Sequence, residues 1–323
     1  MENYVLPFQL TPNILNLCIE ISSLTGRYEG LNFPLPKIEF RKENRIKTIH
    51  GTVAVEGNTL TKGQITAILE GKPVIGPEKD IKEVKNAIRA YDRIKTYNIY
   101  SVKDLCNTHR VLMEGLLPDA GKFRKESVGI IKHSGVSHIA PPAHLVPTHM
   151  NNLFSFLKNN KEHHPLVKAS VFHYELEYIH PFMDGNGRIG RLWEHAVLMQ
   201  WNPLFEVISI ESIVKQRQGE YYNALEISDR KGSCEDFIAF NLSSILEALN
   251  QFFLEFKVEP VTFRDRLGAA ENRFRGRLFS RKDYMELFQT ISTATASRDL
   301  KSGVDSDLLT RSGDKRNALY SFN

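Results

Sequence analysis

Cysteine is scarce in this chain of 323 residues, and the three that occur, Cys18, Cys106 and Cys234, lie far apart. An odd number without any CxxC pair suggests neither a disulfide framework nor a zinc ribbon, and reduced thiols are expected. The first residues lack the pattern of a signal peptide, because they carry no basic segment and are interrupted by Pro7 and Pro12. We find no apolar run long enough to span a membrane. We therefore expect a cytoplasmic protein with no membrane partner.

An excess of one charge is also lacking over most of the chain. The formal net charge is only +4, from 42 Lys and Arg against 38 Asp and Glu. Residues 264–323 contain 12 Lys and Arg and 8 Asp and Glu, an excess of four positive charges, so the remainder is neutral. A charge this small gives no argument for nucleic-acid binding by the whole chain. Only the C-terminal residues are basic enough to raise that question.

Strand patterns are scarce as well, whereas helical periodicity is frequent. Thr61 and Gln64 have the spacing of a capping box and predict the start of a short helix. Alternating β-branched and turn residues predict a hairpin over 128–138 that turns at Ser134-Gly135. We expect an all-α main body with this one hairpin. Apolar residues at helical spacing predict its longer helices over 11–27, 43–56, 80–97, 102–114, 147–158, 165–179, 188–200, 210–229 and 235–256.

The stretch HPFMDGNGRIGR, residues 180–191, lies between two of these predicted helices. Pro181 ends the first helix, so the loop leads directly into the N-terminus of the second. Gly185 and Gly187 allow the backbone to turn and to expose successive N–H groups. The positive end of the helix dipole adds to this, and the loop therefore predicts an anion site.

The polar side chains of the same stretch have complementary chemistry. Arg188 and Arg191 are suited to phosphate oxygens. Asp184 is a hard oxygen ligand for Mg²⁺, which commonly accompanies nucleotide phosphates. His180 can accept a proton from an attacking hydroxyl near neutral pH. Each residue alone is typical of an exposed loop, but together they predict phosphoryl chemistry on a nucleotide.

HPFMDGNGRIGR fits the Fic-domain signature HPFx[DE]GNGRxxR at all nine fixed positions. GKFR at 121–124, IAPP at 139–142 and the helices from about 80 to 250 also resemble a Fic core. The resemblance implies an all-α Fic catalytic core over 80–256, preceded by an N-terminal helical region over 1–79. It also implies transfer of a nucleotide portion, usually AMP from ATP, onto a protein hydroxyl.

The resemblance further implies a role for each matching residue. His180 would deprotonate a target Ser, Thr or Tyr, and Asp184 would hold the Mg²⁺ that bridges the α- and β-phosphates. The hairpin at 128–138 resembles the flap that pairs with a target segment, although an inert surface loop has the same pattern. Arg188 would lie near the β-phosphate and Arg191 on the γ-phosphate. The phosphates would be cradled by Gly185, Asn186 and Gly187.

The stretch TVAVEGN, residues 52–58, places a glutamate at the C-terminal end of a predicted helix, where it opposes the helix dipole. It matches the Fic inhibitory motif [S/T]xxxE[G/N] through Thr52, Glu56 and Gly57. Its position before the core resembles the subclass with an N-terminal inhibitory helix, here about 43–57. Glu56 would then pair with Arg191 and prevent productive ATP binding. In some relatives this glutamate instead positions water that removes AMP, so transfer and removal both stay open.

Residues 263–323 resemble a winged helix, which is an α+β helix-turn-helix domain. They predict two helices and then a hairpin that turns at Ser312-Gly313-Asp314. DNA binding fits the local charge, but protein binding or homodimerisation fits such domains equally well. The outward residues of the recognition segment would be Thr295, Ser297, Arg298 and Lys301, and those of the wing Arg311, Lys315 and Arg316.

Other sites and functions have weaker support. The spacing of His163, His164, His173 and His180 matches no compact zinc-ligand set. Tyr221 and Tyr222 are either walls of an adenine pocket or core aromatic residues. A DNA-binding regulator that retains the Fic fold only to sense nucleotide is an alternative, against which the intact His180 argues. Transfer of another nucleotide also stays open.

Overall fold

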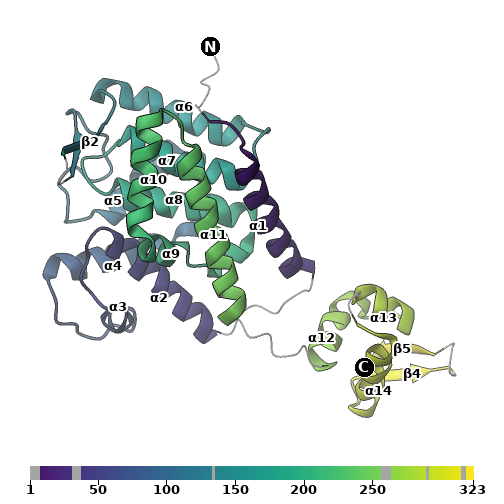
Figure 1. Cartoon of the computed structure of the whole chain (residues 1–323). Coiled ribbons are helices and arrows are strands. Elements are labelled where there is room, and N and C mark those ends of the chain that lie inside the picture. The colour runs from purple at the N-terminus through teal and green to yellow at the C-terminus, as the bar shows by residue number, and fades with distance from the viewer. Residues whose placement is uncertain (1–7, 31–37, 133–134, 256–262, 289–290, 314–317) are drawn as a thin grey trace. The chain divides into compact units, whose positions relative to one another are not determined.

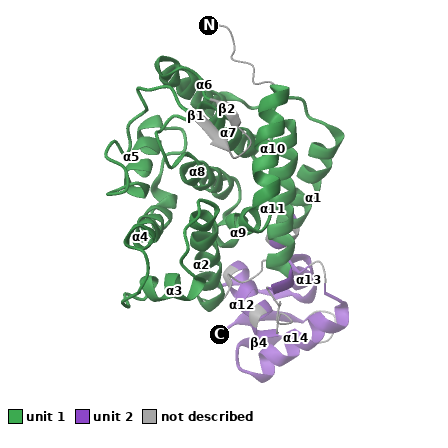
Figure 2. Ribbon diagram, turned by 60° about the vertical axis from the view of Figure 1, so that its left-hand side comes forward, with its two compact units in different colours: residues 1–25, 36–253 green, residues 26–35, 254–323 purple. Residues whose placement is uncertain are grey.

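The computed structural model of the chain describes residues 8–30, 38–132, 135–255, 263–288, 291–313 and 318–323. Its contacts divide the chain into two compact units, residues 1–25 with 36–253 and residues 26–35 with 254–323 (Figure 2). The helices described before residue 80 and those of the expected core lie mainly in the first unit. The elements described after residue 262 lie in the second.

Helices form most of the described part of the first unit (Figure 1). The predicted hairpin is present as the antiparallel pair β1 (Gly129–Lys132) and β2 (Gly135–Ile139), although its turn lies partly outside the described residues. Short 3-10 turns cover Ile94–Thr96, Ala143–Leu145 and Pro203–Val207. The helices are α1 (Pro12–Gly30), α2 (Ile38–Val55), α3 (Lys62–Leu69), α4 (Glu78–Asp92), α5 (Val102–Leu112), α6 (Val146–Asn159), α7 (Pro165–Ile179), α8 (Asn186–Trp201), α9 (Ile210–Gln216), α10 (Gln218–Lys231) and α11 (Glu235–Glu255).

The core of this unit is centred on α7 and α8, which the other helices surround in both views (Figures 1 and 2). Most side chains of α7 are buried, as expected for a helix that carries apolar residues on several sides. Phe172, Phe182 and Trp193 are among the largest fully buried side chains. Because α7 and α8 are packed from all directions, the loop between them is held on a rigid base.

Several local predictions are confirmed. Thr61 and Gln64 form the predicted capping box at the start of α3. Gly57 has a φ of +91° just after α2 ends, a left-handed conformation that glycine adopts without strain. The helix expected over 43–56 begins earlier, at Ile38. The end of this helix was therefore predicted more closely than its start.

The single helix predicted over 210–229 was wrong, because it is broken into α9 and α10 at Arg217. The backbone of Arg217 leaves the helical region with φ −102° and ψ 29°. Its guanidinium is held at 2.7 Å by Glu220 and at 3.0 Å by the Ser243 hydroxyl. Hydrophobic periodicity continues across the bend, which is why the sequence pattern did not show it.

The expectation that no apolar run could span a membrane also needs correction. Helix α11 has 21 residues and a mean hydropathy of 1.3, so by length and composition alone it could cross a membrane. However, 56% of its apolar window is buried inside the structure. Phe237, Leu242 and Leu249 are fully buried, which is typical of the core helix of a globular unit. The cytoplasmic location stays a prediction.

The second unit combines helices with a small sheet. Helix α12 (Phe263–Phe274) was not among the two helices predicted for this region, and its buried Leu267 and Ala270 belong to the core of the unit. The described core also contains Phe279, Tyr284 and Leu300. The sheet is antiparallel in the order β3-β5-β4. The elements are α12 (Phe263–Phe274), β3 (Phe279–Ser280), α13 (Arg281–Leu287), α14 (Thr293–Asp305), β4 (Leu309–Ser312) and β5 (Leu319–Phe322).

Candidate active site

A cavity of about 300 Å³ lies beside the loop that joins α7 to α8. The loop, helix α10 and the C-terminal end of α2 contribute its walls. Most of the residues predicted for the site are therefore brought together, although they are as much as 166 positions apart in the chain. The lining residues are Glu56, Glu177, His180, Met183, Asp184, Gly185, Asn186, Gly187, Tyr221, Tyr222, Leu225, Glu226 and Asp229.

His180 follows the last residue of α7 and adopts a left-handed backbone with φ 49° and ψ 59°. This conformation is uncommon for a residue other than glycine, and it turns the chain out of the helix. The Nδ1 atom lies 3.4 Å from the Glu177 carbonyl oxygen. Because a carbonyl only accepts, Nδ1 carries the proton in this contact. The lone pair is then on Nε2, where it can accept a proton.

The loop is closed by its own polar groups. The Asn186 side chain accepts a hydrogen bond from the Phe182 N–H and donates one to the Phe182 carbonyl, both at 2.9 Å. The Asn186 amide therefore holds the loop, and only its backbone is available to an anion. Gly185 has a φ of +85°, and a Cβ there would lie 2.7 Å from the Met113 sulfur. The loop thus requires both the freedom and the small size of glycine.

His109 on α5 supports this loop and was missed in the sequence. Its Nδ1 accepts a hydrogen bond from the Gly121 N–H at 2.8 Å, so its Nε2 carries the proton and donates to the Asp184 carbonyl at 2.8 Å. The ring stacks on Phe182 with 3.7 Å between centroids. Burial lowers the pKa of His109 to about 4, which keeps the ring neutral. A single histidine on a predicted helix gave no signal for this role.

Arg188 is buried and is held by a second residue that was missed, Glu83 of α4. One guanidinium nitrogen of Arg188 donates to Glu83, and another donates to the Asp184 carboxylate at 2.9 Å. Glu83 also accepts a hydrogen bond from the Asn58 side chain at 2.7 Å. Because Arg188 and Glu83 are each only 5% exposed, their pair lies inside the core.

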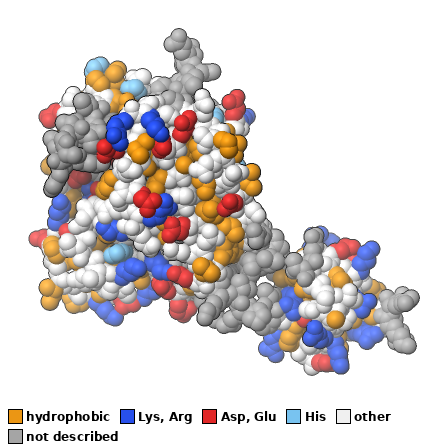
Figure 3. Space-filling view, in the orientation of Figure 1, with side chains coloured by type: hydrophobic (Ala, Val, Ile, Leu, Met, Phe, Trp, Pro, Cys, Tyr) orange, Lys and Arg blue, Asp and Glu red, His pale blue; other side chains and the backbone are white. Residues whose placement is uncertain are grey.

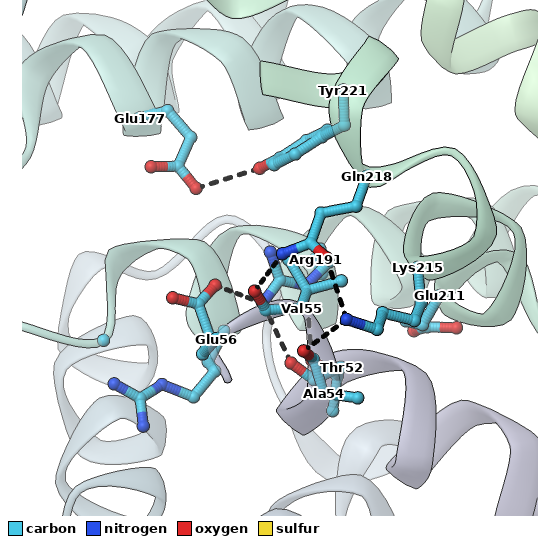
Figure 4. Close-up of polar contacts among 12 residues, drawn as sticks. Thr52, Ala54, Val55, Glu56, Glu177, Arg191, Glu211, Lys215, Gln218 and Tyr221 are labelled. Atoms are coloured by element: carbon cyan, nitrogen blue, oxygen red, sulfur yellow. Dashed lines mark hydrogen bonds and ion pairs between the residues drawn. The ribbon is translucent and has the colours of Figure 1, made fainter. Parts of the chain in front are cut away.

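Arg191, one helical turn further along α8, is bound to the end of α2 (Figure 4). Its Nη2 donates to the Glu56 carboxylate at 2.6 Å and to the Thr52 carbonyl at 3.0 Å. Burial acts to lower the pKa of Arg191, but the Glu56 carboxylate, together with Tyr221 and Glu177, more than offsets it, and the pKa lies above its ordinary value. The structure thus contains the contact between Glu56 and Arg191 that the sequence predicted.

The Glu56 carboxylate also lies against the N-terminus of α8. A Cβ on Gly187 would come within 2.5 Å of the Glu56 Oε1 atom. The carboxylate therefore fills the space beside Gly187, where the helix dipole and the backbone N–H groups favour an anion. Glu56 occupies the position that the sequence analysis assigned to a phosphate.

The C-terminal carbonyls of α2 are bonded by three side chains, which we name the α2 anchor: Lys215, Gln218 and Tyr222. Lys215 donates to the Ala54 carbonyl at 2.9 Å, and Gln218 donates to the Val55 carbonyl at 2.7 Å. The Tyr222 hydroxyl also donates to the Val55 carbonyl, at 3.2 Å. The Ala54 carbonyl also accepts from the Gly57 N–H at 3.1 Å, whereas the Val55 carbonyl lies past the last backbone donor of the helix. The anchor thus completes the bonding of this end and fixes the position of Glu56 (Figure 4).

The two tyrosines predicted for an adenine pocket have different environments. Tyr221 is 1% exposed, and its hydroxyl donates to Glu177 at 3.2 Å, as Figure 4 shows. Tyr222 is half-buried and belongs to the α2 anchor. His173, one of the histidines weighed for zinc, contacts the Tyr221 hydroxyl and bonds to Glu194 at 2.6 Å. No metal-binding cluster of His, Cys, Asp and Glu occurs among the described residues.

Comparison with known proteins identifies relatives of this chain. Residues 99–198 match the model of the Fic/DOC family. The chain is 30% identical over 223 residues to the protein adenylyltransferase Fic of Aedes aegypti, covering 65% of this chain and 41% of that protein. It is 32% identical to the same-named protein of Drosophila erecta, covering 62% and 40%. The chain thus spans about two fifths of the length of these curated relatives.

Solved structures are also similar to this chain. A Fic family protein from Desulfovibrio desulfuricans G20 is 33% identical, with 99% of this chain and 98% of that chain covered and a TM-score of 0.73. Fic-1 from C. elegans, at 23% identity and a TM-score of 0.64 over 76% of this chain and 73% of that chain, shares the fold. The chain belongs to the Fic family.

Proposed function

We propose that the chain transfers AMP from ATP to a hydroxyl of a target protein. The hydroxyl oxygen would attack the α-phosphorus, the bond from that phosphorus to the bridging oxygen would break, and pyrophosphate would leave. The hydroxyl proton would pass to Nε2 of His180, whose Nδ1–H faces the Glu177 carbonyl. Gly185, Gly187 and the N-terminus of α8 would bind the phosphates. The name of the curated relatives, protein adenylyltransferase, supports this proposal.

We further propose that the enzyme inhibits itself through Glu56. The observation that carries this proposal is the contact of the Glu56 carboxylate with both Arg191 and the space beside Gly187. ATP and this carboxylate would compete for one cationic site, so ATP would bind without its γ-phosphate on Arg191. Its α-phosphorus would then lie outside the line of attack. Thr52 and Gly57 would place Glu56, through the Thr52 carbonyl on Arg191 and the turn after α2.

A magnesium ion would fit this site at Asp184. Its carboxylate is 56% exposed and lines the cavity. The Gly185 N–H and the Arg188 guanidinium both donate to Oδ1 of this carboxylate. Mg²⁺ is commonly held by one or two carboxylates together with substrate phosphates and water, so a single aspartate is sufficient. Bound there with ATP, the ion would neutralise phosphate charge.

Incorporation of label from ATP labelled at the α-phosphate would test the function. The assay would contain Mg²⁺ and cell extract as the source of target, with wild type, Glu56→Gly and Glu56→Gly/His180→Ala compared. We expect label on protein to rise about tenfold or more in Glu56→Gly and to disappear when His180 is also replaced. Label at or below the wild-type level in Glu56→Gly would contradict self-inhibition.

The same assay addresses the alternatives. Absence of label in every variant would contradict AMP transfer. Loss of label from a previously modified protein, dependent on Glu56, would favour AMP removal by a positioned water. Binding of ATP without either reaction would favour the nucleotide-sensing regulator.

For the second unit we propose a winged helix that binds nucleic-acid phosphates. The order of its elements fits this fold, and a concavity of about 1190 Å³ is lined by residues of α13, α14 and β4. Arg281, Lys301 and Arg311 line it, and none forms an ion pair with another described residue. Figure 3 shows Lys and Arg side chains over the visible face of this unit. Lys315 and Arg316, predicted for the wing, lie outside the described residues.

Fluorescence anisotropy with a labelled duplex DNA at several salt concentrations would test this proposal. Lys301→Ala should weaken binding and reduce the salt slope by about 1, because one phosphate contact is lost. Arg275→Ala is the control, since Arg275 lies outside the concavity and neighbours Glu271. DNA binding that is weak and independent of Lys301 would contradict the proposal and favour a protein partner or homodimer.

A further inference from the structure

Arg124, the last residue of GKFR, is 4% exposed and takes no part in the chemistry described so far. Its side chain donates only to main-chain carbonyls. Nε bonds to the His180 carbonyl at 2.7 Å, and Nη1 bonds to the Glu126 carbonyl at 2.8 Å. Nη2 bonds to the carbonyls of Ile179, at 3.2 Å, and Pro141. One planar guanidinium thus joins four backbone positions from three segments.

The buried charge of Arg124 is compensated without an acidic partner. No carboxylate among the described residues forms an ion pair with it. Instead, Ile179 and His180 present carbonyls at the C-terminal end of α7, where the helix dipole is negative and carbonyls lack partners within the helix. Arg124 therefore acts as the C-terminal cap of α7, and replacement by lysine would keep the charge but lose the fork of donors.

The first segment held by Arg124 carries the proposed base. His180 has a left-handed backbone, and Arg124 fixes both sides of this turn. Its Nε binds the His180 carbonyl, and its backbone N–H donates to the Pro181 carbonyl at 2.9 Å. The direction in which the His180 side chain leaves the backbone therefore depends on Arg124.

The other two segments are the ends of the hairpin. Glu126 lies three residues before β1 begins at Gly129, and Pro141 lies two residues after β2 ends at Ile139. A further bond joins the same ends, from the Ala140 N–H to the Val128 carbonyl at 3.3 Å. Arg124 thus closes the base of the hairpin with the same group that holds His180.

We propose that Arg124 is a positioning residue that sets the hairpin β1–β2 and His180 in a fixed relation. A hydroxyl presented by a segment paired with the hairpin then meets Nε2 of the base. This inference rests on the proposed AMP transfer, in which the hairpin holds the target. Nucleotide binding should be independent of Arg124, because its side chain bonds to no residue of the phosphate loop from Asp184 to Arg188.

The test uses the full chain with Glu56→Gly as the active background. Arg124→Lys should lower the rate of AMP transfer to protein by about 10- to 100-fold, since small displacements of reacting groups have effects of this size. The KM for ATP should change less than about threefold, because phosphate binding is retained. Arg217→Lys, at a partly buried arginine of the same unit, is the matched control and should keep the background rate.

Two further measurements separate positioning from a general loss of structure. Guanidinium ion should partly restore transfer in Arg124→Ala but not in His180→Ala. In amide NMR spectra, Arg124→Lys should shift the His180 and hairpin signals while those of Gly185 to Arg188 stay in place. Unchanged His180 and hairpin signals, or a KM for ATP that rises as much as the rate falls, would overturn the inference. The spectra remain decisive even if Glu56→Gly alone transfers no AMP, a result that would contradict the proposed function instead.

Discussion

Arg188 and Arg191 lie one turn apart on α8, are both buried and both pair with a glutamate, yet the two pairs differ in their surroundings. Glu83, the partner of Arg188, comes from the middle of α4, is 5% exposed and is also held by Asn58. Glu56, the partner of Arg191, follows the last turn of α2, and its side chain is 27% exposed at the edge of the cavity. The first pair is enclosed by the fold, whereas the second can separate into solvent.

This difference shows how one helix can carry a permanent and a releasable ion pair. Removing one partner of an enclosed pair leaves a charge in a medium that cannot solvate it. At the cavity edge, water or a phosphate can replace the departing carboxylate. Since ATP would supply phosphate oxygens at the Arg191 position, only that pair is suited to regulation.

The largest expected effect on the free energy of unfolding comes from a comparison of two substitutions, Glu83→Gln and Glu56→Gln. Glu83→Gln should lower the free energy of unfolding by about 3 kcal/mol, because the buried Arg188 then keeps only the half-exposed Asp184 carboxylate as a countercharge. Glu56→Gln should lower it by about 1 kcal/mol, since the Thr52 carbonyl still accepts from Arg191. Urea unfolding followed by Trp fluorescence measures both, and the two tryptophans, Trp193 and Trp201, lie in the first unit.

The same two variants should have opposite effects on AMP transfer. Glu56→Gln should raise it, and Glu83→Gln should lower it because Arg188 loses its fixed position beside Asp184. Equal losses of stability in the two variants would show that the exposure of Glu56 does not distinguish the pairs.

The two glutamates also differ in whether the sequence predicts them as residues of the site. His180, Asp184, Gly187 and the two arginines were found because they are adjacent in one stretch with a recognisable order. Glu56 was found because a motif of its own accompanies it. Glu83 was not found, since an acidic residue on an amphipathic helix is ordinarily solvated and nothing local indicates that α4 turns it inward.

The fold shows the same limit. The position of helices follows from periodicity, and the bounds of α7 were predicted without error. The break at Arg217 depends on contacts with Glu220 and Ser243, which periodicity cannot express. The supporting roles of His109 and Arg124 likewise depend on backbone carbonyls of distant segments. Site residues that are adjacent in the chain can be predicted from the sequence. The residues that hold them in position cannot, because tertiary packing brings these together from distant segments.

A smaller effect on the free energy of unfolding is expected from His109, which holds the loop between α7 and α8 through the Asp184 carbonyl. Burial lowers its pKa from 6.5 to about 4, so the unfolded chain binds more protons between these values. The contribution of neutral His109 to the free energy of unfolding is therefore complete above pH 6.5 and is lost as the pH falls toward 4. Between pH 7 and pH 5 the free energy of unfolding should drop by about 2 kcal/mol from this residue. Urea unfolding at both pH values measures it.

His109→Gln is the comparison for that experiment, because glutamine retains hydrogen-bonding groups and does not titrate. The drop between pH 7 and pH 5 should be smaller in the variant by the amount assigned to His109. An identical drop in both proteins would show that the His109 ring does not remain neutral in the folded state.

The smallest effect on stability is expected from the α2 anchor, which holds the end of α2 next to Glu56. Gln218→Ala removes one hydrogen bond to the Val55 carbonyl, a contribution of about 1 kcal/mol. Detachment of the α2 end, and with it AMP transfer, should increase about fivefold. Gln216→Ala, at an exposed position two residues earlier, is the matched control and should leave the rate unchanged. The increase should vanish in the Glu56→Gly background, where no carboxylate remains on Arg191 to be released. If Gln218→Ala still raised the rate there, the anchor would act on catalysis itself and not on the release of Glu56.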